Sequence, residues 1–261
     1  MAGSDCPGGA GIQADLKAFS ANETFGMSVI TSVVAENTTR VLSVFNVPVE
    51  EIQKQIDAVF EDIHVDAVKL GMLPTAEIIS AVADKLNEYK PSIIVCDPVM
   101  VATSGDALSE GGTVSTMREK LFPIVTLLTP NIPEAEAISG LEIKNENHME
   151  KAARIIMDMG VKNVLVKGGH LTGDAVDYLC TPEGVHKLVC KRVDSPNTHG
   201  TGCTLSSAIT ANLAHGMDML SAVTKAKNYI TEAIEKSFTV GKGHSPVNHF
   251  YDYYDLKGTV L

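Results

Sequence analysis

A glycine-rich segment, Asn197-Thr198-His199-Gly200-Thr201-Gly202-Cys203-Thr204, comes directly before a predicted helix over residues 203–215. Two glycines in a tight turn leave backbone N–H groups unpaired at the start of a helix. These donors and the helix dipole together bind an anion. The chemistry that such a turn serves is stabilisation of a phosphoryl group during its transfer. On this motif alone, a glycine-rich turn that merely starts a helix is an equally good interpretation.

A second glycine-dense segment extends from Gly3 to Asp15, with the sequence GSDCPGGAGIQAD, and also opens a helix. Its glycines allow the backbone to approach a ligand closely, and the carboxylate of Asp15 could hold a hydroxyl group or a ring nitrogen. The segment does not match the dinucleotide-binding fingerprint, because both the preceding strand and the G-x-G-x-x-G spacing are missing. A plain surface loop is the weaker interpretation, given the density of glycines.

Polar residues that follow apolar strands make up a third group. The oxygens of Asn131 and Glu134 suit Mg²⁺ on a nucleotide phosphate. On spacing alone we prefer a helix-capping pair, since Glu three residues after Asn is the usual reciprocal partner. Lys167, in the segment Lys167-Gly168-Gly169-His170, could reach a phosphate, although a solvated lysine in a turn is the better interpretation in isolation. Asp97 lies either near a metal ion or at a helix cap.

Strand-like and helix-like segments alternate along the chain. Strands are predicted over residues 27–35, 67–71, 92–97, 125–129 and 164–166. Helices are predicted over residues 49–60, 76–89, 149–159, 203–215 and 220–236. This alternation predicts an α/β fold, with a parallel sheet covered by helices on both faces, in a single domain over residues 1–261. Ligands in such folds bind beyond the carboxyl ends of the strands.

The composition excludes several classes of partner. The formal net charge of −11, without a basic run, argues against binding to nucleic acid or to an anionic membrane. No signal-like start and no apolar run of about 20 residues is present. The cysteines are odd in number and lack metal-ligand spacing, which predicts free thiols and a cytoplasmic location; they are Cys6, Cys96, Cys180, Cys190 and Cys203. The histidine spacing suggests no zinc or iron site.

Taken together, the segments resemble the hydroxymethylpyrimidine/phosphomethylpyrimidine kinases of thiamine biosynthesis, in the ribokinase-like superfamily and near the pyridoxal kinases. The resemblance covers essentially the whole chain, and the order of eight segments is far more specific than any one of them. They are AGSD..GGAGIQADLK, VAEN, KLGML, CDPVM, TPNIPEAE, KGGH, NTHGTGCT and GKGHSPVNHF. The resemblance implies a ribokinase-like fold with a central, mostly parallel sheet, ATP and Mg²⁺ as cofactors, and a homodimer.

The resemblance also implies roles for individual residues. The pyrimidine pocket would be lined by Gly3, Ala10, Asp15, Glu36, Met72 and Val99. The ATP phosphates would be bound by Asn131, Glu134, Lys167 and Thr204, and the metal by Asp97 and Glu134. The catalytic group would comprise Gly200, Thr201 and Gly202 as an anion hole, with Lys167 and Cys203.

The implied reaction is in-line transfer of the γ-phosphoryl group of ATP to the hydroxymethyl group of the pyrimidine. A second transfer to the monophosphate follows. Cys203 stands where most ribokinase-like enzymes have an aspartate base. A free thiol has a pKa of about 8.5, and a helix N-terminus lowers it, which favours a thiolate at this position.

Two features depart from the family pattern. Glu36 replaces the glutamine of some members, and an ionised glutamate accepts hydrogen bonds but cannot donate them. The family has an apolar first strand before the segment AGSD, whereas only Met1 and Ala2 precede Gly3. We therefore expect the first strand to be absent or truncated.

Three alternative functions remain open. A pyridoxal/pyridoxine kinase would share the fold, the cofactor and a cysteine at the base position, although the segments NTHGTGCT and GKGHSPVNHF favour a pyrimidine substrate. A cysteine-nucleophile acyl enzyme would use Cys203 with His199 as its base, but nothing else completes that set. A non-catalytic pyrimidine-binding regulator would have no need of Lys167, Asn131 and Glu134.

Overall fold

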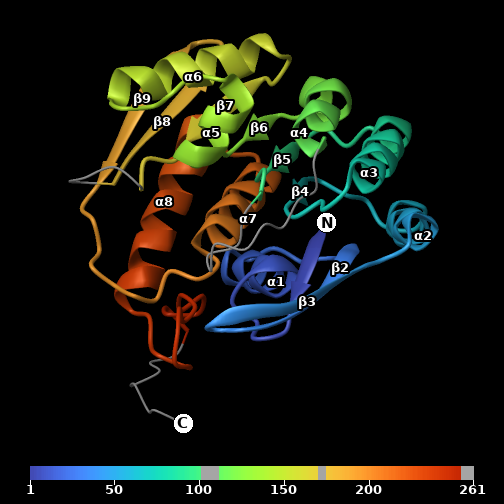
Figure 1. Cartoon of the computed structure of the whole chain (residues 1–261), viewed down its shortest axis with the longest axis horizontal. Coiled ribbons are helices and arrows are strands. Elements are labelled where there is room, and N and C mark those ends of the chain that lie inside the picture. The colour runs from blue at the N-terminus through green and yellow to red at the C-terminus, as the bar shows by residue number, and fades with distance from the viewer. Residues whose placement is uncertain (101–111, 170–174, 254–261) are drawn as a thin grey trace.

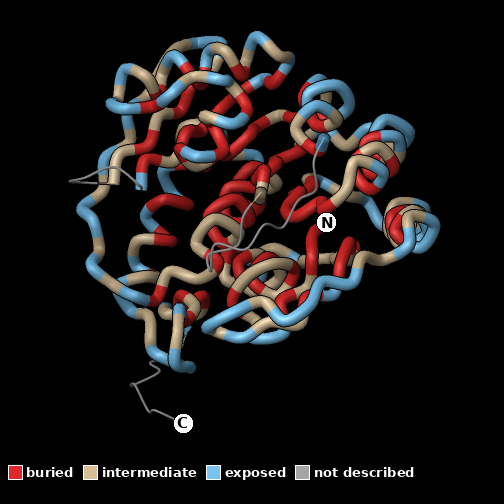
Figure 2. Tube along the Cα trace, in the orientation of Figure 1, coloured by how far each residue is buried: buried red, intermediate tan, exposed pale blue. Residues whose placement is uncertain are grey.

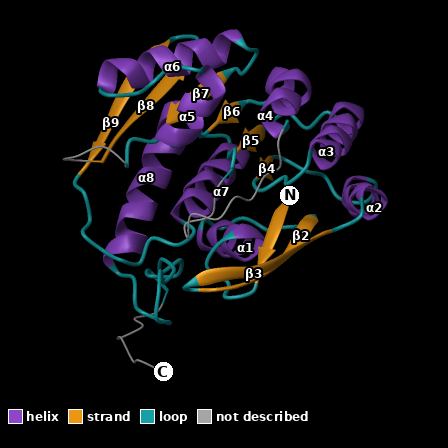
Figure 3. Ribbon diagram, viewed as in Figure 1, coloured by secondary structure: helices purple, strands orange, loops and turns teal. Residues whose placement is uncertain are grey.

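The computed structural model describes residues 1–100, 112–169 and 175–253, in which a layer of strands lies between helices (Figure 1, Figure 3). One sheet has the strand order β4-β5-β6-β7-β8-β9. Strands β4 to β7 are parallel, whereas β8 and β9 are antiparallel to their neighbours. The strands are β4 Val68–Leu70, β5 Ile94–Cys96, β6 Leu127–Leu128, β7 Asn163–Val166, β8 Ala175–Thr181 and β9 Gly184–Cys190. The sheet is therefore mostly parallel at its centre, as predicted.

A second, three-stranded sheet adjoins the first. It contains β1 Ala2–Asp5, β2 Ile30–Asn37 and β3 Arg40–Asn46. Strand β1 pairs in parallel with β2, and β3 pairs antiparallel with β2. The amino group of Met1 donates to the carbonyl of Lys69 at 2.7 Å, and Gly71 N–H donates to the carbonyl of Met1 at 2.9 Å. These bonds place β1 between β2 and β4, so a first strand is present in the structure, with four residues.

Helices cover both faces of the six-stranded sheet. On one face lie α7 Thr201–Ala214 and α8 Met219–Glu235, and α1 Gly11–Ala21 packs against α7. The opposite face carries α2 Val49–Phe60, α3 Ala76–Tyr89, α4 Thr113–Thr116, α5 Ile132–Ser139 and α6 Glu146–Asp158. A π-helical turn at Met117–Leu121 and a 3₁₀ turn at Phe122–Ile124 follow α4. None of the helices in the described part of the chain is long and apolar enough to cross a membrane.

The central strands are apolar on both sides because both sides are covered. Val95, Leu127 and Leu165 pack with the residues of α7 and α8. Their chain neighbours Cys96 and Leu128 point the other way and pack with α3, α5 and α6. This alternation divides the core into two apolar layers, one on each face of the sheet. Figure 2 shows the buried segments gathered in the strands and on the inner sides of the helices.

Helices were predicted more accurately than strands. The predicted helices over 49–60 and 76–89 coincide with α2 and α3. The predicted strand over 92–97 shortens to β5, and the one over 27–35 moves to β2. Strands β1, β3, β8 and β9 were not predicted. Most residues of β3 and β9 are exposed or half-buried and lack the apolar run that marks the central strands.

Candidate active site

The carboxyl ends of the parallel strands bring the predicted polar residues to one edge of the molecule. Asp5 ends β1, and Asp97 directly follows β5. Asn131 and Lys167 follow β6 and β7 and form an isolated parallel bridge with each other. In addition, Lys167 N–H donates to the carbonyl of Pro130 at 2.8 Å. The expected meeting of polar side chains beyond the strand ends is therefore found.

The turn before α7 depends on a glycine. Gly200 has φ of +76°, a left-handed conformation that favours glycine, and a Cβ there would overlap the carbonyl oxygen of Gly9. The turn therefore packs backbone against backbone on the N-terminal glycine-dense segment. No side chain caps the start of α7. The Thr201 N–H already donates to the carbonyl of Thr198 at 3.3 Å, so an anion hole here would use the other N–H groups at the start of the helix.

Lys167 and Asp97 lie directly beside this turn. Lys167 Nζ is 2.7 Å from Asp97 Oδ1, which also accepts a hydrogen bond from Thr129 Oγ1 at 3.0 Å. A Cβ on Gly202 would lie 3.1 Å from Asp97 Oδ2 and 3.3 Å from Lys167 Nζ. Burial alone would lower the pKa of Lys167, but Asp97 and Glu134 raise it above its ordinary value. The lysine is therefore a fixed positive charge within reach of the turn.

Asn131 and Glu134 cap the start of α5 reciprocally. Asn131 Oδ1 accepts from Glu134 N–H at 2.9 Å, and Glu134 Oε2 accepts from Asn131 N–H at 2.8 Å. The capping pair that we preferred on spacing alone is confirmed. Burial raises the pKa of Glu134 to about 7, Lys167 opposes this rise and Asp97 adds to it. Above about pH 7, ionised Glu134 adds a second carboxylate to Asp97 beside one lysine, and the resulting excess of negative charge suits a divalent cation.

Several of the predicted substrate residues lie near one another. A Cβ on Gly3 would be 3.0 Å from Met72 Cε, so Gly3 and Met72 are in contact. Ala10 N–H donates to Asp5 Oδ2 at 2.7 Å at the start of α1. Val99 is half-buried, and its N–H donates to the carbonyl of Asp97 at 2.8 Å.

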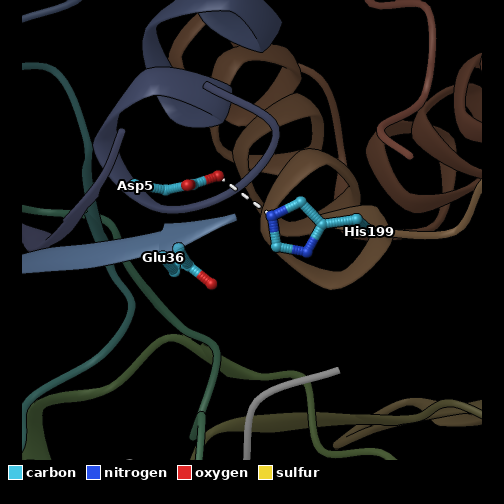
Figure 4. Close-up of side chains that lie close together, drawn as sticks. All are labelled: Asp5, Glu36 and His199. Carbon is cyan, nitrogen blue, oxygen red and sulfur yellow. Dashed lines mark hydrogen bonds and ion pairs between the residues drawn. The ribbon is translucent and has the colours of Figure 1, made fainter. Parts of the chain in front are cut away.

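Figure 4 shows Asp5 and His199 pointing toward each other, with the carboxylate of Glu36 close by. His199 Nε2 is 3.0 Å from Asp5 Oδ2, and one ligand atom from each of the three residues lies within 4.8 Å of the others. Burial alone would lower the pKa of His199, but Asp5 and then Glu36 raise it. Burial alone would raise the pKa of Asp5, but His199 and two backbone N–H groups lower it. The pair therefore favours its charged form, and it ties the turn before α7 to the end of β1.

Asp15 lies deeper than the predicted pyrimidine pocket. Its Oδ1 is 2.7 Å from Lys69 Nζ of β4 and accepts from Ser207 Oγ of α7 at 2.8 Å. Its side chain is only 3% exposed. Neither Lys69 nor Ser207 stands out as a site residue in the sequence. The signal for Lys69 was available, because a lysine in the middle of a short apolar strand is rarely buried without a partner.

Two other assignments change in the structure. Thr204 is fully buried, and its hydroxyl donates to the carbonyl of Gly200 at 2.8 Å and lies 3.0 Å from His249 Nε2. It therefore holds the turn, and the Thr204 hydroxyl itself is not exposed to a nucleotide. Burial raises the pKa of Cys203 to about 11, despite the opposing charge of Lys69, so the expected thiolate is not favoured.

The remaining predicted residues are easily placed. Thr201 and Cys203 are half-buried in the first turn of α7. Among the described residues, no hydrogen bond joins Cys203 to His199, whose Nε2 is bonded to Asp5 instead. This arrangement gives no support to a cysteine nucleophile activated by His199. His170 lies outside the described residues.

Phosphoryl transfer needs positioned cations and backbone donors more than a strong base, and this edge of the sheet supplies both. The fold and the site together define a small-molecule kinase of the ribokinase-like class.

The chain belongs to the phosphomethylpyrimidine kinase family, whose profile matches residues 5–248. A hydroxymethylpyrimidine/phosphomethylpyrimidine kinase of Haemophilus influenzae is 44% identical over 255 residues, which cover 96% of this chain and 95% of that protein. A thiamine biosynthesis bifunctional protein of Geobacter sulfurreducens is 49% identical over 98% of this chain. The chain spans 53% of the length of that bifunctional relative.

Solved structures of two kinases have the same fold. A phosphomethylpyrimidine kinase of Clostridium difficile superposes with a TM-score of 0.80 at 46% identity, covering 89% of this chain and 96% of the other. A pyridoxal kinase of Bacillus subtilis in complex with ADP superposes with a TM-score of 0.89 at 39% identity, covering 95% of each chain.

Proposed function

We propose that this chain transfers the γ-phosphoryl group of ATP to 4-amino-5-hydroxymethyl-2-methylpyrimidine, and then a second phosphoryl group to the resulting monophosphate. One observation carries the proposal beyond family membership. The uncapped glycine turn of α7 abuts Lys167 and Asp97, with both side chains within 3.3 Å of a Cβ built on Gly202. The product of the two steps is the pyrophosphate used in thiamine biosynthesis.

The reaction is an in-line displacement. The hydroxyl oxygen of the pyrimidine forms a bond to the γ-phosphorus while the bond from that phosphorus to the β,γ-bridging oxygen breaks. ADP leaves with the electron pair, and the hydroxyl proton is released. Backbone N–H groups of the Gly200–Gly202 turn and the ammonium group of Lys167 stabilise the charge on the transferring group. Since the transition state is loose, a protonated Cys203 thiol at the acceptor hydroxyl is compatible with turnover.

Mg²⁺ would be held by Asp97 and Glu134. Among the described residues, these two carboxylates are not part of a three-ligand protein cluster. That fits an ion which takes its other ligands from water and from nucleotide phosphates. When bound, Mg²⁺ neutralises charge on the phosphates. Asn131 supports the site by orienting Glu134 through the reciprocal cap.

The pyrimidine would lie between the β1–β2 side of the site and the turn of α7. We propose Gly3, Ala10, Met72 and Val99 as walls of this pocket. Glu36 would accept hydrogen bonds from the exocyclic amino group of the pyrimidine. Asp15 supports the pocket from beneath, since its Oδ1 is bound by both Lys69 and Ser207.

Pyridoxal is the second candidate substrate. It is favoured by the TM-score of 0.89 with a pyridoxal kinase. The pyrimidine is favoured by the higher sequence identity, 46%, with a solved phosphomethylpyrimidine kinase. Glu36 also favours the pyrimidine. Its anionic carboxylate can accept hydrogen bonds from the exocyclic amino group of the pyrimidine, and the pyridoxal ring has no such group.

Family resemblance also supports a homodimer and a cytoplasmic location, the latter consistent with the free cysteines. Sedimentation analysis would test the dimer, and fractionation of the source cells would test the location.

The deciding experiment is a steady-state assay with Mg-ATP and three acceptors run side by side: the hydroxymethylpyrimidine, its monophosphate and pyridoxal. We expect turnover of both pyrimidines and a kcat/KM for pyridoxal at least about tenfold lower. Lys167→Met should lower kcat about 100-fold. Lys162→Met is the control, because Lys162 lies directly before β7 whereas Lys167 lies directly after it, and this variant should not lower kcat. A preference for pyridoxal would overturn the pyrimidine assignment. ATP binding without turnover of any acceptor would instead favour a binding regulator.

A further inference from the structure

Three elements meet at one buried carboxylate beneath the α7 turn. Lys69 Nζ of β4 lies 2.7 Å from Asp15 Oδ1 of α1, and Ser207 Oγ of α7 donates to the same oxygen at 2.8 Å. The side chains of Lys69 and Asp15 are 1% and 3% exposed. The cluster therefore lies inside the protein.

The cluster lies one helical turn below the proposed acceptor site. Ser207 follows Cys203 by one turn on α7, and Asp15 follows Gly11 by one turn on α1. At the upper level, the backbone N–H of Gly11 is near enough to the Cys203 thiol to lower its pKa. The two helices thus meet at two levels, and the Lys69–Asp15–Ser207 cluster fixes the lower one.

Stability alone does not account for this cluster. A buried ion pair is often no more stabilising than apolar side chains of the same volume, because both charges must lose their water. Here Asp15 Oδ2 is also buried and has no hydrogen-bond partner among the described residues. The Lys69–Asp15 ion pair is present despite this cost and lies next to the proposed reactive site, which points to a role in the reaction.

Four charged groups interact with the Cys203 thiol. They are Asp15 of α1, Lys69 of β4, Asp97 after β5 and Lys167 after β7. Burial is the largest influence on the thiol, and Lys69 is the next, acting in the opposite direction. Lys167 is paired with Asp97 and Lys69 with Asp15, so the two lysines near the thiol are held by different carboxylates.

We propose that Lys69 is a positioning residue for phosphoryl transfer, an inference that rests on the proposed kinase function. Through Asp15 and Ser207 its ammonium group fixes the facing starts of α1 and α7. Its positive charge also stabilises negative charge on the Cys203 sulfur and on the acceptor oxygen beside it. Lys167 acts on the phosphates, whereas Lys69 acts on the acceptor.

The test uses the full chain in a Cys6→Ser/Cys190→Ser background, which removes the two more accessible thiols other than Cys203. The main variant is Lys69→Met/Asp15→Asn, which removes both charges and leaves no uncompensated buried ion. Lys85→Met is the matched control, because Lys85 Nζ also lies 2.7 Å from a carboxylate, Asp57 Oδ1, but between α3 and α2. Measurements are kcat and KM, the pH profile of Cys203 alkylation by iodoacetamide followed by mass spectrometry, and the melting temperature.

We expect the double variant to lose about tenfold or more in kcat, with the KM for ATP changed less than about threefold. Its alkylation profile should move to higher pH, and Lys85→Met should match the background in both measurements. Background-like kcat and alkylation in the double variant would overturn the proposal. A lowered melting temperature with an unchanged alkylation profile would reduce Lys69 to a structural role and overturn it equally.

A second variant covers the case in which the double variant fails to fold. Ser207→Ala removes one hydroxyl and leaves the ion pair intact, so we expect a folded protein with kcat about threefold lower and an unchanged KM for ATP. Background-like kcat in Ser207→Ala would contradict positioning through α7. If the background protein phosphorylates no acceptor, the proposed function fails, while alkylation still reports on the charge of Lys69.

Discussion

At the scale of single residues, the Asp5–His199 pair makes stability depend on pH. His199 has a raised pKa in the folded protein, so its contribution is complete below its unfolded value of about 6.5 and is lost as the pH rises through the folded value. Asp5 has a lowered pKa, so its contribution is present above about 3.8 and is lost as the pH falls through its folded value. The pair therefore contributes most between about pH 4 and pH 6.5.

His199→Gln should accordingly lower the free energy of unfolding by about 1 to 3 kcal/mol near pH 5.5, and by clearly less above pH 8. Urea denaturation across this pH range would measure the difference. His64→Gln is the control, since His64 also faces an aspartate, at 3.5 Å, but its side chain is 90% exposed. An effect of His199→Gln that is the same at every pH would contradict a charged pair.

The role of Cys203 can be tested separately. A thiol with a pKa of about 11 is almost fully protonated at pH 7.5, so a base role demands a strongly pH-dependent rate. If Cys203 accepts the proton, Cys203→Ala should lower kcat about 100-fold at pH 7.5 and remove the rise of kcat with pH. A near-unchanged rate would exclude the base role and leave the kinase assignment intact. Pre-steady-state phosphorylation would show that the chemical step is being measured.

Residue types revealed the site only in part. Lys167, Asp97 and the glycine turn were recognised because strand ends meet at one edge of a parallel sheet, which spacing predicts. The burial of Asp15 was not predictable, because its partners Lys69 and Ser207 are 54 and 192 positions away along the chain. Such long-range contacts decide whether Asp15 or Glu36 lines the proposed pyrimidine pocket and which of the two supports it.

At the scale of elements, the junction between α1 and α7 requires a glycine for two reasons that can be separated. Gly200 combines a φ of +76° with backbone contact to Gly9, whereas Gly140, which ends α5, has a φ of +74° and nothing within 4 Å of a built Cβ. Gly140→Ala should therefore show the conformational cost alone, about 1 kcal/mol.

Gly200→Ala adds the steric overlap, which must displace either the α7 turn or the Gly9 loop. We expect a loss of kcat of about 100-fold or more and a melting temperature below that of Gly140→Ala. Calorimetry and the kinase assay together would measure both effects. Equal behaviour of the two variants would show that the turn before α7 tolerates a shift and is not a rigid anion hole.

Helical elements follow from local sequence more directly than strands do. The apolar spacing of α2 and α3 marks where these helices begin and end. In addition, the side chains of Thr75 and Asn145 cap the starts of α3 and α6, and sequence alone can suggest such caps. Strand β3 has no such signal, because its apolar residues Leu42, Val44 and Phe45 are largely exposed. Its existence depends on pairing with β2, a contact that a window along the chain does not contain.

At the scale of the whole molecule, stability resides in the two apolar layers on either face of the sheet. Ile79 of α3 is fully buried in one layer, whereas Ile63 is 39% exposed. Ile79→Ala should lower the free energy of unfolding by about 2 to 5 kcal/mol, and Ile63→Ala by less than about 1 kcal/mol. Chemical denaturation would compare them. A small effect at Ile79 would mean that the layer around α3 relaxes into the space that the substitution leaves.

The three-layer architecture was predictable, because continuous apolar strands alternating with helices permit few other arrangements. The strand order was not. Strand β1 lies between β2 and β4, so the segment Ala2–Asp5 lies beside residues that are far from it along the chain. No local sequence pattern encodes such a pairing.

The same position of β1 has a consequence for the order of events during folding. The hydrogen bond from the amino group of Met1 to Lys69 spans 68 positions, and it closes only after β4 has been made. Contacts of long sequence separation require loop closure before they can contribute favourable energy. Strand β1 is therefore fixed on both edges only after β2 and β4 are available, so the segment carrying Gly3 and Asp5 joins the native structure late.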